Sequence, residues 1–147
     1  SGEATGGTLR AMPHSGSDNI RVALLGFGFA GRIFHAPFIA TTRGLRLHVI
    51  ASSRRDEIAL AHPEARVVAT PEEAIEDEDV DLVVVATPND LHAPLAEAAL
   101  RAGKHVVVDK PFTITLDEAR RVVAVAAESG RVLSVFQNRR FDSDHQA

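Results

Sequence analysis

The chain has no cysteine, no tryptophan and no tyrosine, and its single methionine is Met12. Without cysteine, it can form no disulfide, no thiolate zinc site and no cysteine nucleophile, and this lack fits a reducing compartment. No apolar run approaches the roughly 18 residues of a membrane-spanning helix. The N-terminal residues also lack the apolar stretch of a secretion signal. We therefore expect a cytoplasmic location and no membrane partner.

Positive charge is also sparse. The 147 residues include 16 lysines and arginines against 20 aspartates and glutamates, a net charge of −4, with no dense basic stripe. Nucleic acid is therefore not an expected partner. The seven histidines form no i, i+4 pair and no H-E-x-x-H pattern, so no metal site is predicted. The acidic run over residues 72–81 is interpreted as a solvated face.

Residues 1–18 are rich in glycine, serine and threonine and show no periodic apolar pattern. We expect them to be a disordered tail; with Met12 as the natural start, residues 1–11 would be left over from recombinant expression. The remainder, residues 19–147, is long enough for one domain with its own core, since 45% of the chain is hydrophobic.

Short apolar runs alternate with helical segments from Asn19 onward. The expected strands are Ile20–Leu25, Leu45–Ala51, Arg66–Ala69, Asp81–Ala86, His105–Asp109 and Arg131–Val135. The expected helices are Ala30–Ala40, Pro71–Ile75, Leu91–Ala102 and Leu116–Ser129, whereas the segment from Asp56 to Pro63 fits no clear pattern. Alternating strands and helices predict an α/β fold with a doubly wound parallel sheet, a Rossmann fold, in the strand order 3-2-1-4-5-6.

The helix ends carry recognisable signals. Thr70 and Thr115 are each followed three residues later by glutamate, which predicts two capping boxes. Gly103 and Gly130 follow the last residues of two helices, where a left-handed backbone is needed.

A glycine loop, Gly26-Phe27-Gly28-Phe29-Ala30-Gly31, directly follows the first strand and opens a helix. In this context Gly26 allows a tight turn, Gly28 lets backbone amides approach a pyrophosphate, and Gly31 lets the helix pack closely. The alternative is a glycine-rich turn without a ligand. The strand–loop–helix context favours a dinucleotide site.

The second strand ends at Ser52, Ser53 and Arg54, where enzymes that use NAD usually place a carboxylate for the ribose hydroxyls. Arginine and serine can instead bind a 2′-phosphate, so NADP is expected rather than NAD. The alternative is a solvated basic turn. Asp56 and Glu57 lie too far along the chain to be assigned to the ribose.

Two further loops follow the fourth and fifth strands, at the edge where such sheets bind ligands. The first offers Thr87, Pro88, Asn89 and His92; its alternative role is a helix-capping turn. The second contains Asp109 and Lys110. A lysine beside an oxidised nicotinamide would have a lowered pKa, which suits proton transfer near neutral pH. A salt bridge at a strand end is the alternative there.

Together these motifs resemble the glucose-fructose oxidoreductase/inositol dehydrogenase/MocA family, over residues 20–144 or so. The stretches that carry the resemblance are residues 26–37, 87–92 and 102–111, and the ending Asn138-Arg139-Arg140-Phe141-Asp142. Phe-His-Ala-Pro at residues 34–37 and the Asn-Arg-Arg ending are similar to a subgroup that includes NADP-dependent scyllo-inositol dehydrogenase.

The resemblance implies roles for individual residues. Lys110 would be the catalytic lysine near the nicotinamide and the substrate. Asp109 stands where the family usually has glutamate and would bind the nicotinamide ribose. The remaining cofactor residues would be Thr87, Pro88, Asn89 and His92, the subgroup's NADP-binding pattern at Ser52, Ser53 and Arg54, and Asn138 and Arg139 at the border of the cleft.

Family members also have a second domain built on an open antiparallel sheet, which binds the substrate and forms much of a homo-oligomer interface. This chain stops at Ala147, before that domain. We therefore expect the cofactor half of an NADP-dependent oxidoreductase acting on a sugar or polyol, with little turnover by itself. The alternatives are a non-catalytic nucleotide-binding module and, less favoured because an acidic ribose ligand is missing, a domain that binds S-adenosylmethionine.

Overall fold

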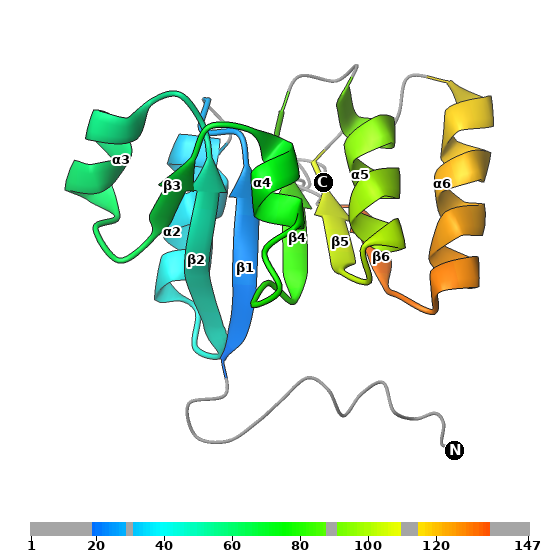
Figure 1. Ribbon diagram of the computed structural model, residues 1–147, viewed down its shortest axis with the longest axis horizontal. Coiled ribbons are helices and arrows are strands. Elements are labelled where there is room, and N and C mark those ends of the chain that lie inside the picture. Colours follow the sequence, from blue (N-terminus) through cyan, green and yellow to red (C-terminus); the bar gives the residue numbers. More distant parts are fainter. Residues whose placement is uncertain (1–18, 29–30, 88–90, 110–114, 136–147) are drawn as a thin grey trace, which may run out of the picture.

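The computed structural model describes residues 19–28, 31–87, 91–109 and 115–135. Within these residues a six-stranded parallel sheet has the order β3-β2-β1-β4-β5-β6, which confirms the predicted order (Figure 1). The strands are β1 (Ile20–Leu25), β2 (Leu45–Ala51), β3 (Arg66–Val68), β4 (Leu82–Val85), β5 (His105–Val108) and β6 (Leu133–Val135). Four of them are one or two residues shorter than the apolar runs from which they were predicted.

Helices cover both faces of this sheet. They are the π-helical turn η1 (Gly31–His35), α2 (Ala36–Thr41), α3 (Arg55–Ala61), α4 (Pro71–Ile75), α5 (His92–Arg101) and α6 (Leu116–Ser129). Ala23 and Leu25 of β1 belong to the core cluster that includes α4, α5 and α6, while Val22 and Leu24 belong to the cluster with α2 and α3. All four are fully buried, which explains why β1 is apolar at successive positions.

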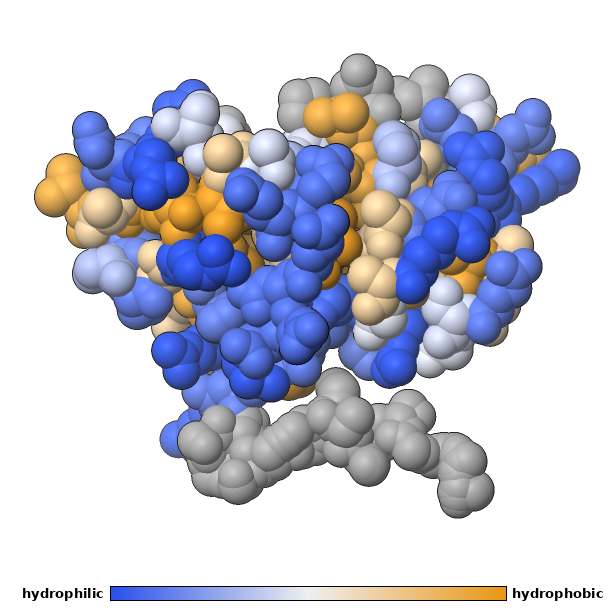
Figure 2. All heavy atoms as spheres, viewed as in Figure 1, coloured by the Kyte–Doolittle hydropathy of each residue, from blue (hydrophilic) through white to orange (hydrophobic). Residues whose placement is uncertain are grey.

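The outer surface over α4, α5 and α6 is mainly hydrophilic, and hydrophobic side chains show there chiefly between the elements (Figure 2). On the other face a groove of about 490 Å³ opens between α2 and the strands. Its lining is mostly apolar: His35, Phe38, Ile39, Leu45, Leu82, Val84, Val107, Ser134 and Val135. None of the helices in the described part of the chain is long and apolar enough to cross a membrane.

The predicted helix ends are confirmed. At Thr70 and at Thr115 both hydrogen bonds of a capping box are present, with Glu73 and Glu118 as the reciprocal partners. Gly130 ends α6 in the left-handed conformation with φ 69°, as the sequence predicts for a glycine at that position.

Two helices differ from expectation. The helix after the glycine loop begins as a π-helical turn and becomes α-helical only at Ala36. Pro37 has no N–H to donate to Ile33, which interrupts the regular hydrogen-bond ladder at this point. The segment for which the sequence showed no pattern contains α3. Its only fully buried residue is Ile58, so the helix has no apolar stripe that periodicity could reveal.

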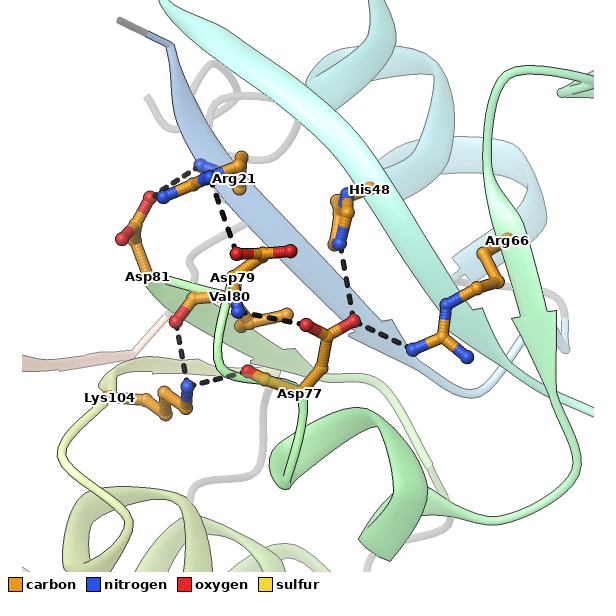
Figure 3. A network of polar contacts seen from close by, with 8 residues as sticks. All are labelled: Arg21, His48, Arg66, Asp77, Asp79, Val80, Asp81 and Lys104. Atoms are coloured by element: carbon orange, nitrogen blue, oxygen red, sulfur yellow. Dashed lines mark hydrogen bonds and ion pairs between the residues drawn. The ribbon is translucent and has the colours of Figure 1, made fainter. Parts of the chain in front are cut away.

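The acidic run before β4 is only partly solvated, contrary to expectation. The side chain of Asp77 is 10% exposed, and its Oδ2 lies 2.7 Å from an Arg66 nitrogen and 3.2 Å from Nε2 of His48 (Figure 3). The backbone N–H of Asp79 donates to Oδ1 at 2.8 Å. Ligand atoms of His48, Asp77 and Asp79 lie within 4.8 Å of one another, but the Arg66 guanidinium already neutralises the most buried carboxylate.

The same cluster ties β1 and the start of β5 to this loop. Lys104 is 7% exposed, and its ammonium donates to the carbonyl oxygens of Asp77 and Val80 at 2.8 and 2.9 Å. Burial lowers the pKa of Lys104, against the effect of the surrounding carboxylates, of which Asp77 is the strongest. On the other side, the N–H of Arg21 donates to Asp81 at 2.9 Å.

Asp77→Asn is expected to lower the free energy of unfolding by about 1–2 kcal/mol at pH 7, because hydrogen bonds to a charged group are lost. Burial raises the pKa of Asp77, but the hydrogen bond from Arg66, the Asp79 N–H and nearby positive charge together hold that pKa below 3.8. The contribution is therefore complete above pH 3.8 and is lost as the pH falls further. The free energies of unfolding of the wild type and Asp77→Asn should therefore become equal as the pH falls. Urea unfolding of both proteins at several pH values measures this difference.

The control is Asp79→Asn, because the Asp79 side chain is 67% exposed and its carboxylate makes only a long ion pair with Arg21, at 3.8 Å. That variant should change stability by no more than about 0.5 kcal/mol. Equal losses in the two variants at pH 7 would contradict the special role of Asp77.

Candidate dinucleotide-binding site

The carboxyl ends of the central strands bring the four predicted loops to one edge of the sheet. The N–H of Gly26 donates to the carbonyl of Ala51 at 3.0 Å, which joins the glycine loop to the end of β2. The N–H of Asp109 donates to the carbonyl of Val85 at 3.0 Å, which joins the end of β5 to the end of β4. Residues that are far apart in the sequence therefore share one edge of the sheet, at the position where the strand order reverses.

Two glycines of the loop allow close backbone contacts. Gly26 has φ 102°, and a Cβ atom there would lie 2.8 Å from the carbonyl oxygen of Ala86. A Cβ atom on Gly31 would lie 2.5 Å from the carbonyl oxygen of Gly26. No side chain fits at either position without a shift of backbone atoms, so these two glycines are required by the fold itself.

The middle glycine is different. Gly28 is exposed, and a Cβ atom built on it would meet no other atom within 4 Å. Its carbonyl accepts the N–H of Arg32 at 2.8 Å. The space beside Gly28 is therefore open on the side where a ligand could approach the backbone.

The two phenylalanines predicted with this loop cannot both be placed. Phe27 is 2% exposed, and its ring packs edge-on against His62 at a centroid distance of 6.1 Å. Phe27 can thus contribute only its backbone to a ligand, while its side chain anchors the loop to the end of α3. Phe29 and Ala30 lie outside the described residues.

The loop after β4 offers a polar atom that lacks a partner. The hydroxyl oxygen of Thr87 is buried and has no hydrogen-bond partner among the described residues. The backbone nitrogen of Thr87 is 3.2 Å from the Cβ position of Gly26, so the backbone of Thr87 packs against the glycine loop. A buried hydroxyl without a partner is costly, and a bound polar group would satisfy it.

His92 supports the same loop from inside. Its side chain is 1% exposed, and Nε2 lies 2.9 Å from the carbonyl oxygen of Thr87. The geometry makes Nε2 the donor, because a carbonyl oxygen can only accept. His92 therefore fixes the backbone next to the site, where the sequence suggested a residue that lines the cofactor. Pro88 and Asn89 lie outside the described residues.

The basic turn after β2, Ser52 to Arg54, is largely exposed, and a hydrogen bond to the Ser52 side chain orders its backbone. The N–H of Ser52 donates to Val68 of β3 at 3.0 Å, and the hydroxyl of Ser52 accepts the N–H of Arg54 at 3.1 Å. Ser53 is exposed. The Arg54 side chain is 53% exposed and lies 3.3 Å from a carboxylate oxygen of Glu57, so a ligand at this edge could reach it.

A pairing that the sequence analysis missed connects the first helix with Asp109. Nε2 of His35 lies 3.4 Å from Oδ2 of Asp109, and the two side chains are 4% and 16% exposed. From the sequence, His35 stands out only as part of the Phe-His-Ala-Pro stretch. This stretch therefore places a nearly buried imidazole next to the carboxylate at the end of β5.

Three predicted residues of the second half of the site, Lys110, Asn138 and Arg139, lie outside the described residues. Their predicted roles therefore stay predictions. Within the described part, the glycine loop, Thr87, the basic turn and Asp109 surround one edge of the sheet. This set offers backbone amides, a hydroxyl, a guanidinium and a carboxylate, the groups that recognise a dinucleotide in such sheets.

Several known proteins are similar to this chain. The model of a family described as "Oxidoreductase family, NAD-binding Rossmann fold" (GFO_IDH_MocA) matches residues 20–137. The chain is 57% identical over 128 residues to the uncharacterized oxidoreductase YdgJ of Escherichia coli, covering 87% of this chain and 37% of that protein. It is 40% identical over 127 residues to the scyllo-inositol 2-dehydrogenase (NADP⁺) IolW of Bacillus subtilis, covering 86% and 36%.

A solved structure gives the same result for the fold. The crystal structure of biliverdin reductase from Synechocystis, in complex with biliverdin and NADP⁺, superposes with a TM-score of 0.79 at 32% identity, covering 86% of this chain and 40% of that one. The chain thus spans little more than a third of the length of these relatives.

The two kinds of glycine are separable by experiment. Gly31→Ala should lower the free energy of unfolding by about 1–3 kcal/mol, because its methyl group overlaps the Gly26 carbonyl. Gly28→Ala should leave thermal stability nearly unchanged but weaken dinucleotide binding about tenfold or more, the equivalent of one lost hydrogen bond. Thermal unfolding and titration calorimetry on both variants test this, and a stable Gly28→Ala protein with wild-type affinity would contradict it.

Proposed function

The chain belongs to the Gfo/Idh/MocA oxidoreductase family, and we propose that it is the cofactor-binding part of an NADP-dependent oxidoreductase that acts on a sugar or polyol. The observation that carries this proposal is the glycine loop, in which Gly26 and Gly31 are closed by backbone contacts and Gly28 is open. In the neighbouring loop the buried hydroxyl of Thr87 has no partner among the described residues. Sequence and structure favour the same edge of the sheet.

The residues that are present fit a dinucleotide. Its pyrophosphate would lie against the backbone at Gly28, where a Cβ atom would meet nothing within 4 Å. The hydroxyl of Thr87 would hydrogen-bond to the cofactor, which removes the cost of a buried polar atom without a partner. His92 orients the backbone of Thr87, because its ring nitrogen Nε2 donates a hydrogen bond to the Thr87 carbonyl oxygen.

The preference for NADP is supported by the turn after β2. Ser52 and Ser53 stand where NAD enzymes usually have a carboxylate, and the exposed guanidinium of Arg54 can pair with a 2′-phosphate. The relative IolW has NADP⁺ in its name, and the biliverdin reductase structure contains NADP⁺. Both facts support the preference by analogy.

The nicotinamide, which is the reacting end of the cofactor, would lie at the carboxyl end of β5. Bound NADP supplies the hydride acceptor for oxidation of a hydroxyl-bearing carbon, or NADPH supplies the donor for the reverse reaction. Asp109, whose Oδ2 lies 3.4 Å from Nε2 of His35, would accept hydrogen bonds from the nicotinamide ribose. Lys110 would take the proton from the substrate hydroxyl as the carbonyl forms, and return it in the other direction.

A polyol such as an inositol is the proposed substrate class, because the relative IolW is a scyllo-inositol 2-dehydrogenase. Most of the length of that relative has no counterpart in this chain, so the remaining substrate contacts would come from outside it. A cytoplasmic location and a homo-oligomer for the full-length protein belong to the same proposal.

Arg54→Ala should weaken NADP binding about tenfold or more, because a charge-assisted hydrogen bond contributes on the order of 1.5–3 kcal/mol. NAD binding should be unchanged. The matched control is Arg55→Ala, which removes a neighbouring arginine whose guanidinium lies 3.5 Å from the Val67 carbonyl on β3. This variant should bind NADP as the wild type does. Titration calorimetry with both cofactors decides the question. Equal wild-type affinity for NADP and NAD, unchanged in Arg54→Ala, would refute the 2′-phosphate assignment.

The 147-residue chain should bind NADP but show little or no turnover with scyllo-inositol, because loss of substrate positioning alone costs orders of magnitude in rate. NADPH formation followed by absorbance at saturating cofactor is the measurement. Steady-state turnover comparable to that of a complete dehydrogenase would show that this chain holds the whole substrate site.

A further inference from the structure

We propose that Glu57 acts as an internal competitor for the 2′-phosphate, and that Arg32 is the second guanidinium of that phosphate site. The inference rests on the proposed NADP binding and adds a pair of residues that set cofactor selectivity. The sequence alone assigns neither residue to the cofactor: Glu57 lies beyond the expected ribose position, and Arg32 follows the glycine loop without a predicted role.

The geometry brings two arginines to one carboxylate. Nε of Arg32 lies 3.4 Å from Oε2 of Glu57, and a guanidinium nitrogen of Arg54 lies 3.3 Å from Oε1. Arg32 comes from η1 and Glu57 from α3, while Arg54 precedes α3. A single anion thus bridges guanidiniums that flank the site from two different elements.

Both arginines are anchored next to residues that would touch the cofactor. The N–H of Arg32 donates to Gly28 at 2.8 Å, so its side chain starts from the glycine loop. The N–H of Arg54 donates to the Ser52 hydroxyl at 3.1 Å. A cofactor whose pyrophosphate lies at Gly28 would therefore place its adenosine ribose between these two side chains.

The three side chains are accessible and weakly held. Arg32, Glu57 and Arg54 are 43%, 41% and 53% exposed, and exposed ion pairs contribute little to stability. A phosphate monoester carries about −1.5 to −2 charges near neutral pH and offers three oxygens. It is therefore a stronger partner for two guanidiniums than one carboxylate, and it would displace Glu57 from them.

Glu57 then has a definite effect on selectivity. Its negative charge opposes the 2′-phosphate of NADP but not the neutral 2′-hydroxyl of NAD. Removing that charge while keeping the size of the side chain should favour NADP alone. The alternative is that Glu57 accepts hydrogen bonds from the ribose hydroxyls of NAD, as acidic residues do in many such sites. In that case replacement of Glu57 by glutamine would weaken NAD binding.

The test is titration calorimetry of NADP and NAD on the wild type, Glu57→Gln, Arg32→Ala and the double variant. Glu57→Gln should tighten NADP binding about twofold to fivefold, the range expected for one exposed ion pair, and leave NAD binding unchanged. Arg32→Ala should weaken NADP binding and spare NAD. In the double variant the gain from Glu57→Gln should be smaller than in the wild-type background, because one of the competing guanidiniums is gone.

The control is Glu128→Gln, an exposed glutamate on α6 that makes the same change in net charge far from the glycine loop. An equal gain in NADP affinity there would mean that overall charge, and not Glu57, is responsible. A fall in NAD affinity in Glu57→Gln, or an unchanged NADP to NAD ratio, would overturn the inference while leaving NADP binding intact. Failure of the wild type to bind NADP would overturn the proposed function as well.

Discussion

The rest of this structure depends on one close contact, between the first turn of the helix after β1 and the carbonyl of Gly26. A Cβ atom on Gly31 would come within 2.5 Å of that oxygen, so the helix can start directly above the strand only because glycine is there. The contact leaves Gly28 on the outside with open space beside it. It also directs Arg32 and His35, in the π-helical turn that follows, toward α3 and β5 respectively. A single steric constraint thereby positions the open backbone at Gly28 and the side chains of Arg32 and His35.

The two edges of the sheet serve different purposes. At the amino edge, Asp77 and Lys104 have their partners within the protein, and the cluster ties β1, β2, β3 and the start of β5 to one loop. At the carboxyl edge, the Thr87 hydroxyl is buried without a partner among the described residues, and Arg54 is half exposed. Polar groups satisfied inside the chain stabilise a fold, whereas those left unsatisfied at an edge are available for a ligand.

Supporting residues stand behind the groups that would touch the cofactor. His92 holds the Thr87 backbone, His35 lies against Asp109, and the Ser52 hydroxyl orders the N–H of Arg54. In each case a side chain acts through a neighbour. Glu57 differs, because it pairs with the same cations that a phosphate would use, and so it would influence which cofactor is preferred without contributing to the framework.

Much of this protein is determined by the sequence alone, because the relevant interactions are local. Both capping boxes and the close packing at Gly26 and Gly31 follow from patterns within a few residues, and the structure bears them out. The strand order follows from the alternation of strands and helices along the chain and the general topology of such sheets, and the structure confirms it. Only the tertiary structure decided which charges meet. The pairs His35–Asp109, His48–Asp77 and Arg32–Glu57 join separate elements. Their partners are set by how strands and helices pack, and nothing in the spacing of these residues records that packing.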